Sequence, residues 1–398
     1  MAPSRPSKKG KQEKQQQQQQ KPNNAGALLA DADTQYEVGN LDEAIALAGR
    51  ALEATGPGGD FELRALNSLG IYSLEAGDAE DARGFFTRAV ALDEQGLVDE
   101  RVGGGPDKFL FLAQLSEEGG QDSVSWFERG AAALRAQILA LSGESKGDDK
   151  NSSGGGGSSS SSSAGEALAH AQTRLGGVLC AVAEVYMTDL SWEADAEARC
   201  EALVTEAMLI APGAAETWQT VANVRISQER AEEARAALRR SLELWQDLGP
   251  EDPAVPAFPT RVSLARLLME TEMEEQALVV LERLVTDDDS SVEVWYLGGW
   301  CLYVAGEKLR EARQQKEEED EEEDEWKATW RYARRWLMQC LKLYELEEYE
   351  DERLGAHAAE LLASINGELG EPPEDEDDEA WEGISDDDEG HEDAEMEG

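Results

Sequence analysis

An internal repeat limits the fold of this sequence more than any other feature. The clearest unit places Leu66 and Gly70 on one predicted helix, Gly77 and Asp78 at a turn, and Ala82 on a second helix. Similar units recur at a spacing of mostly about 34 to 43 residues, a period typical of repeated helical pairs. Such a chain lengthens by adding pairs and not by enlarging one core.

Sixteen residues separate the first large residue of each clear unit from the first small residue of its second helix. This spacing joins Leu28 to Ala44, Leu66 to Ala82, Phe109 to Ser125, Trp218 to Ala234 and Arg261 to Ala277. Two further units begin at Leu179 and Trp295, and the second of these resumes at Ala333 after an insertion. Small residues let paired helices approach closely, and large ones fill the gaps between pairs. The predicted fold is an all-α, right-handed superhelical solenoid of tetratricopeptide type, with about seven helical pairs and a capping helix around Glu352 to Ile365.

Low-complexity segments flank and interrupt this solenoid, which we place at residues 25–369. Residues 1–24 are basic and Gln-rich, and residues 370–398 are acidic, so both are expected to be disordered. A Ser/Gly insertion at 142–165 is expected to be a flexible loop without a functional role. The acidic insertion at 311–325 is either a solvated helix extension or a contact for a partner.

The charge of the chain narrows the choice of partners. There are 36 Lys and Arg residues against 85 Asp and Glu residues, which gives a formal net charge of −49. This charge repels nucleic acid and anionic membranes, and it attracts cationic partners at a rate that falls as salt rises. We therefore expect a basic protein partner, with no direct nucleic-acid or membrane contact.

The four cysteines are far apart, each within an apolar helical pattern: Cys180, Cys200, Cys301 and Cys340. They are expected to be buried, reduced thiols and not metal ligands or disulfides. The sequence has no apolar stretch typical of a membrane span or a secretory signal. A soluble intracellular protein is the expectation.

No catalytic constellation appears in the sequence. It has no phosphate-binding loop, GxSxG elbow, HExxH motif or CxxC pair. Of the three histidines, His391 lies in the acidic tail, while His170 and His357 are expected to be partly exposed helix residues. We therefore expect a protein that is not an enzyme and has no cofactor or metal.

Function is then expected on the concave face, which the first helix of each unit lines. The positions one, five and eight residues after the first large residue are mainly apolar or acidic, and Arg266 is their one basic member. Aromatic groups beside glutamates can hold Arg and Lys through cation–π contacts and ion pairs. For Trp300 and Tyr303, packing between repeats is an equal alternative. The predicted partner-binding residues are Glu184, Glu216, Asn223, Glu270, Glu293, Tyr296, Trp300 and Tyr303.

One familiar role of tetratricopeptide proteins does not fit this face. Co-chaperones of the large heat-shock proteins bind an acidic peptide through basic residues of the groove. The positions where a clamp lysine would be sought hold Asn67, Leu110, Cys180, Gln219, Val262 and Tyr296. An anionic peptide would be repelled.

The order of these segments resembles a known family. A basic Gln-containing start, seven divergent repeats, a late acidic insertion and the tail EPPEDEDDEAWEGISDDDEG are together similar to the fungal assembly chaperones of ribosomal protein L-four. The resemblance covers most of the chain and departs at the insertion 142–165. It implies a chaperone that captures a newly made basic ribosomal protein, protects its long internal loop, and escorts it from the cytoplasm to the nuclear pre-60S particle. An import receptor would then be engaged through the client.

Two other classes of protein remain open from the residues alone. A scaffold subunit of a multiprotein complex would use the groove for an ordinary peptide, and a histone chaperone would use its acidic segments for histones. A chaperone of one ribosomal protein should recover a single basic client whose binding weakens steeply with salt. A scaffold should instead recover several stable partners.

Overall fold

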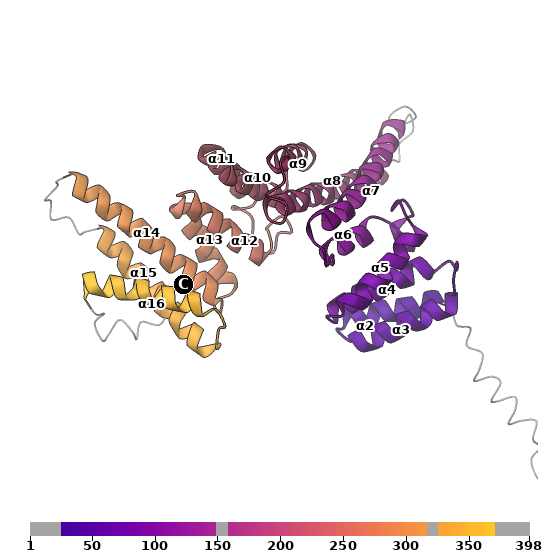
Figure 1. Cartoon of the computed structure of the whole chain (residues 1–398), viewed down its shortest axis with the longest axis horizontal. Helices are drawn as coiled ribbons and strands as arrows, with labels where there is room; N and C mark the ends of the chain where they lie inside the picture. Colours follow the sequence, from indigo (N-terminus) through magenta and orange to yellow (C-terminus); the bar gives the residue numbers. More distant parts are fainter. Residues whose placement is uncertain (1–24, 149–157, 317–324, 371–398) are drawn as a thin grey trace, which may run out of the picture. The chain divides into compact units, whose positions relative to one another are not determined.

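The computed structural model describes residues 25–148, 158–316 and 325–370, and every regular element within these ranges is a helix (Figure 1). Two compact units divide the chain, one ending at Pro256 and the other beginning at Ala257. The boundary follows Pro250 and Pro253, in a stretch between helices. Proline there stops a helix because its ring fixes φ and removes a backbone donor.

The first unit consists of consecutive helices that pack as pairs. They are α2 (Ala25–Glu37), α3 (Leu41–Thr55), α4 (Glu62–Glu75), α5 (Ala79–Leu92), the short 3-10 helix η1 (Glu100–Val102), α6 (Asp107–Gln114), α7 (Gly120–Asp148), α8 (Ser158–Met187), α9 (Ala196–Ile210), α10 (Ala215–Ser227) and α11 (Ala231–Glu243). The pairs are α2–α3, α4–α5, α6–α7, α8–α9 and α10–α11, and α7 also packs on α8.

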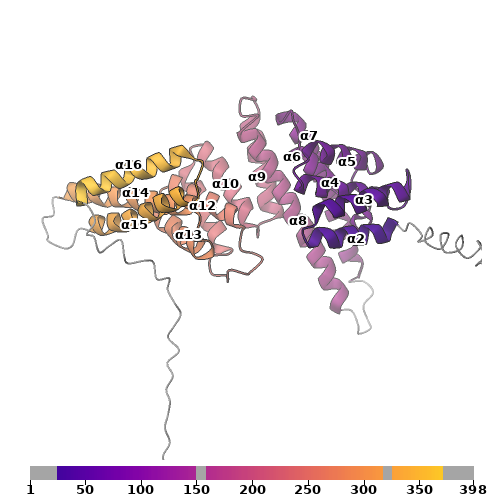
Figure 2. The same cartoon turned by 90° about the horizontal axis from the view of Figure 1, so that it is seen from below.

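The second unit has two pairs and a final helix (Figure 2). Its helices are α12 (Phe258–Glu270), α13 (Glu274–Asp287), α14 (Val292–Lys316), α15 (Glu325–Leu346) and α16 (Glu352–Leu369). Helix α16 packs against both α15 and α14. The described chain therefore confirms the predicted all-helical fold of about seven pairs with a helix at the end.

The packing of each pair follows from the large and small residues of the repeat. Leu66, Ala82 and Phe86 are at most 1% exposed in the α4–α5 pair. A Cβ atom on Gly70 would lie 2.6 Å from the Phe86 ring, so only glycine allows this approach. Gly298 of α14 has the same relation to Trp336 of α15. The two helices of a pair can therefore approach closely because particular positions of the repeat hold glycine.

The turn within several pairs requires a left-handed backbone residue. Gly39 and Gly77 supply it before α3 and α5, with φ of 79° and 82°. Glu229 and Glu272 occupy the corresponding position before α11 and α13, with φ of 58° and 60°. Glycine adopts this conformation freely, whereas a residue with a Cβ is strained in it.

A buried ion pair holds the connection between α5 and α6. Lys108 Nζ lies 2.7 Å from Asp93 Oδ2, and the two side chains are 0% and 4% exposed. Lys108 also donates to the Gly105 carbonyl at 2.6 Å, while Asp93 Oδ1 accepts from the backbone N–H groups of Leu97 and Val98. Burial lowers the pKa of Lys108, and the attraction of Asp93 opposes this effect. Every polar atom of the carboxylate therefore has a partner, which a buried charge requires.

The expected loop at 142–165 is wrong at both ends. Helix α7 continues to Asp148 and α8 begins at Ser158, and residues 149–157 lie outside the described part of the chain. Helix propagation adds one hydrogen bond per residue, so packed helices can continue into a sequence of weak helix propensity. Helix α14 reaches Lys316 and α15 starts at Glu325, so the acidic insertion at 311–325 is helical at both ends, and residues 317–324 lie outside the described part of the chain. The predicted terminal segments 1–24 and 370–398 lie outside the described residues, apart from Gly370.

The third pair corrects the predicted register. Ser125 was expected to face the first helix, but it is exposed, and Ser123 is buried in its place. The Ser123 hydroxyl donates to the Ala113 carbonyl at 2.8 Å. Helix α6 has eight residues, so the turn comes earlier and the second helix is shifted by two positions. A spacing that holds for longer first helices therefore fails here.

Candidate binding surfaces

Three predicted partner-binding residues lie on the first helices of two neighbouring pairs in the first unit. We call Glu184 of α8 with Glu216, Thr220 and Asn223 of α10 the acidic surface. Glu184, Glu216 and Asn223 are exposed. The Thr220 hydroxyl lies 3.5 Å from Glu184 Oε1 and 3.3 Å from the Glu216 carbonyl oxygen. Packing of α10 against α8 thus brings the two glutamates to one face.

The acidic surface holds its charge in a partly dry environment. Glu184 is exposed, but surrounding protein atoms remove enough water to raise the pKa of its carboxyl. Cys180 lies beneath it at 6% exposure, and burial, with a smaller contribution from the charges of Glu184 and Glu216, raises its pKa to about 11. Electrostatic attraction is stronger where water is partly excluded. A cationic side chain placed here would relieve the cost of holding Glu184 ionised.

Aromatic side chains dominate the corresponding face of the second unit. We call Arg266, Glu293, Tyr296, Trp300 and His357 the aromatic surface. A hydrogen bond of 2.8 Å joins Tyr296 Oη to His357 Nδ1. The Trp300 ring lies edge-on to His357 with 5.4 Å between centroids, and Trp300 is 37% exposed. Helices α14 and α16 therefore contribute a partly exposed ring cluster, and α12 adds Arg266.

Charge on the aromatic surface is balanced within the chain. Arg266 lies 2.5 Å from Glu293, so this predicted anion already has a partner. Glu270, at the end of α12, is exposed and has no ion pair with another described residue. Of the two glutamates predicted here, Glu270 is the one whose charge is available.

Tyr303 belongs partly to the packing between helices. Its ring stacks on Trp330 of α15 with 5.1 Å between centroids. Its hydroxyl lies 3.3 Å from Glu307 and 3.1 Å from Ser364 of α16. This arrangement agrees with the packing alternative for Tyr303, whereas Trp300 retains an exposed face.

The sequence analysis missed the part played by His357. It correctly placed this histidine as a partly exposed helix residue, but not against Tyr296 and Trp300. Leu354, Ala358 and Leu361 form the buried stripe of α16, and His357 lies at its edge. Helical spacing therefore predicts that His357 lies beside the buried face of α16. No pattern in the sequence identifies the aromatic rings that it contacts.

The four cysteines are free and buried, as expected. Within the described residues, no group of three or more His, Cys, Asp or Glu side chains is arranged to hold a metal ion. No helix in the described ranges has the length and apolar character needed to cross a membrane.

Stacked helical pairs with an acidic and an aromatic face define a helical-repeat binding protein of the tetratricopeptide class. No family model matches the sequence. A curated relative from Emericella nidulans, a probable assembly chaperone of rpl4, is 44% identical over 371 residues, which cover 90% of this chain and 88% of the relative. The chain belongs to the family of assembly chaperones of rpl4, the ribosomal protein called L-four above.

Two further comparisons agree with this family. A probable assembly chaperone of rpl4 from Schizosaccharomyces pombe is 32% identical over 343 residues, covering 85% of this chain and 90% of the relative. A solved structure of the assembly chaperone of RpL4 (Acl4), residues 1–338, is 57% identical and has a TM-score of 0.65. The match covers 73% of this chain and 99% of that structure.

Proposed function

We propose that this chain is an assembly chaperone that binds newly made rpl4, protects its long internal loop, and escorts it from the cytoplasm to the nuclear pre-60S particle. The observation that carries the proposal is the family relation, which extends over 90% of the chain. The role consists of binding and release and has no chemical step. Any import receptor would be engaged through the client.

The charge of the chain explains how it would recognise such a client. A protein that binds ribosomal RNA presents cationic surfaces, which bind stray nucleic acid or aggregate before assembly. Glu184 and Glu216 on the acidic surface, and Glu270 beside the aromatic surface, offer carboxylates in place of RNA phosphates. Trp300 adds an exposed ring that can stack on a cationic side chain.

Charge reversal on the predicted faces tests the proposal. The test variant replaces four glutamates with lysine, two in each unit: Glu184, Glu216, Glu270 and Glu293. Each exposed ion pair contributes only about 0.2–1 kcal/mol, so the four changes are combined. Equilibrium binding to purified rpl4 is measured at physiological and at high salt. We expect tight, salt-sensitive binding by the unchanged chain and a loss of at least about tenfold in the variant.

A matched control carries the same change in net charge on second helices. It replaces four exposed glutamates that have no ion pair among the described residues: Glu53, Glu80, Glu275 and Glu282. This control should bind rpl4 within about twofold to threefold of the unchanged chain, because only long-range attraction is lost. Equal weakening in both variants would mean that charge acts without a defined face. Recovery of core histones or of several stable partners from cells, without rpl4, would contradict the function itself.

A further inference from the structure

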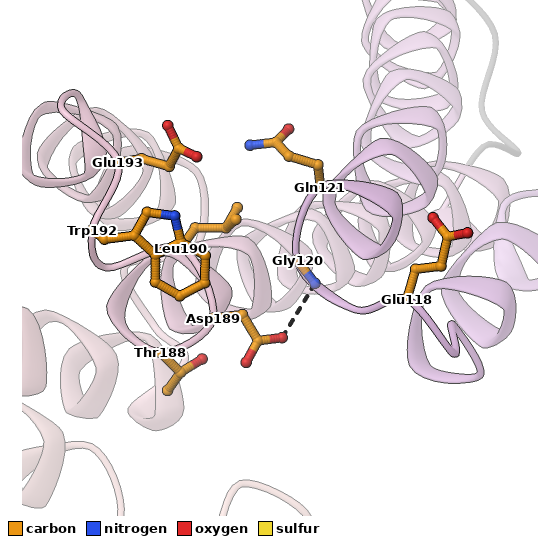
Figure 3. Close-up of a pocket in the computed structure, with 8 residues that line it drawn as sticks. All are labelled: Glu118, Gly120, Gln121, Thr188, Asp189, Leu190, Trp192 and Glu193. Carbon is orange, nitrogen blue, oxygen red and sulfur yellow. Dashed lines mark hydrogen bonds between the residues drawn. The ribbon is translucent and has the colours of Figure 1, made fainter.

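An open pocket in the first unit lies where two neighbouring pairs turn. Its volume is about 680 Å³, and it is bordered by the α6–α7 turn and the α8–α9 turn (Figure 3). We call it the Trp192 pocket. Its lining residues are Glu118, Gly120, Gln121, Thr188, Asp189, Leu190, Trp192 and Glu193.

Two glycines bring the turns together. Gly119 and Gly120 have φ of 60° and 45°, and the Gly120 N–H donates to Asp189 Oδ2 at 3.2 Å. A Cβ atom on Gly119 would lie 3.0 Å from that carboxylate oxygen, and one on Gly120 would lie 3.2 Å from Leu190 Cδ2. The two turns are therefore joined by a hydrogen bond and by close contacts, and the positive φ of both glycines would strain a larger residue there.

Trp192 is an exposed aromatic side chain at the mouth of this pocket. Its surface is 74% accessible, although the neighbouring Leu190 is 4% accessible. It lies in the lengthened connection between α8 and α9, and its indole has no ring contact or hydrogen bond with any described residue. Tryptophan is enriched at interfaces, because its indole offers a large apolar face together with a polar N–H group.

Of the carboxylates of this pocket, that of Glu193 lies beside the Trp192 indole, whereas Glu118 lies on the far side of the α6–α7 turn (Figure 3). Glu118, Asp189 and Glu193 line the pocket, and no Lys or Arg does. The side chains of Glu118 and Glu193 have no ion pair within the described residues. Two arginines pair with other acidic residues that do not line the pocket. Arg83 pairs with Glu117, and Arg199 pairs with Asp195 and Glu128. The pocket thus presents an aromatic face with the Glu193 carboxylate beside it.

The pocket also continues the acidic surface. Thr188 lines the pocket, and its hydroxyl donates to the Glu184 carbonyl oxygen at 2.8 Å. Residues four apart on a helix lie about one turn apart, roughly 6 Å along the axis. A segment bound across Glu184 can therefore reach the pocket with a neighbouring side chain.

We propose that the Trp192 pocket binds an arginine side chain from a basic segment of the client. The guanidinium plane stacks on the Trp192 indole while its N–H groups donate to Glu193. Arginine fits better than lysine, because its planar group stacks on rings, is weakly hydrated and donates in two directions. The inference rests on the proposed function, since it uses the same client.

Binding of purified rpl4 to the full chain tests this pocket. Trp192→Ala should weaken binding by about twofold to fivefold, as expected for an exposed cation–π contact. Adding Glu193→Gln should bring the loss to about fivefold to tenfold. Trp192→Tyr should keep part of the affinity, because tyrosine still offers a ring face. Two exposed controls away from the pocket, Glu80→Gln on α5 and Leu209→Ala on α9, should bind as the unchanged chain does.

A direct probe separates arginine from lysine. The tryptophans are replaced with 5-fluorotryptophan, and the Trp192→Phe variant identifies the Trp192 resonance by fluorine NMR. Hexa-arginine should shift that resonance at a concentration at which hexa-lysine does not. Equal shifts from both peptides would overturn the preference for arginine, and no shift from either would overturn the site.

Failure of the pocket is distinguishable from failure of the proposed function. If the unchanged chain does not bind rpl4, the proposed client is wrong. If it binds, and the double variant Trp192→Ala with Glu193→Gln binds as tightly, the Trp192 pocket takes no part and this inference is overturned.

Discussion

The buried pair Lys108–Asp93 should stabilise the first unit strongly, and Asp93→Asn tests how strongly. The asparagine keeps an oxygen that can accept from Leu97 and Val98, while a neutral NH2 donor replaces the charged oxygen that accepts from Lys108. Lys108 has no exposed side-chain surface. Breaking a buried pair by removing one partner costs about 3–5 kcal/mol. Because Gly105 still accepts from Lys108, we expect the lower end of that range.

Hydrogen exchange is the suitable assay, because unfolding of repeat proteins is not always two-state. Peptides from α5 and α6 of the full chain should lose protection by about a hundredfold, the equivalent of about 3 kcal/mol. Peptides from α12 to α16 serve as the internal control and should not change. The double variant Asp93→Leu with Lys108→Met should recover most of the loss, since it leaves no unpaired charge. Unchanged protection in Asp93→Asn would refute the reasoning.

The pH dependence of Asp93→Asn has a defined sign. Losing the attraction of Asp93 lowers the pKa of Lys108 further below its usual range. A base with a lowered folded-state pKa binds fewer protons than the unfolded chain between its two pKa values, so stability rises with pH in that window. The deficit of the variant should therefore shrink from neutral toward alkaline pH. A deficit that is constant or grows over that window would contradict a charged, unpaired Lys108.

Two other predictions concern turns and binding. Replacing Glu229 by Gly should raise the free energy of unfolding by about 0.5–1 kcal/mol. The gain from removing the backbone strain of a left-handed glutamate exceeds the entropy cost of glycine. A lower thermal midpoint would contradict this prediction. Glu184 has a raised pKa, so rpl4 binding should begin to weaken on acidification at a higher pH than for an ordinary Glu. In Glu184→Gln that early loss should disappear from the binding-versus-pH curve, while Glu53→Gln should retain it.

Residue spacing predicted the paired helices because a close helix–helix contact needs small and large residues at fixed intervals. Gly70, Ala82 and Phe86 all lie where this rule placed them. The rule failed at Ser125 because the length of α6 sets the register, and composition does not fix that length. The loop expected at 142–165 was predicted from composition instead, and its ends were wrong because helices that begin in packed segments extend into Ser-rich sequence.

The candidate surfaces were less accessible to sequence reasoning, because they depend on contacts between distant helices. The pair Arg266–Glu293 joins α12 to α14, and its formation depends on how those helices pack. His357 meets Tyr296 across 61 positions of sequence. The connection between α8 and α9 is longer than in the other pairs of the first unit. Its length alone does not predict that Trp192 is exposed.

The buried thiols provide a built-in reporter for each unit. Cys180 and Cys200 lie in the first unit, Cys301 and Cys340 in the second, and burial raises the pKa of all four. Alkylating reagents attack the thiolate, so labelling requires transient opening of the surrounding helices. A client that binds one unit slows opening of that unit. Labelling rates at the four cysteines, measured by mass spectrometry, would therefore show which of the two units binds the client.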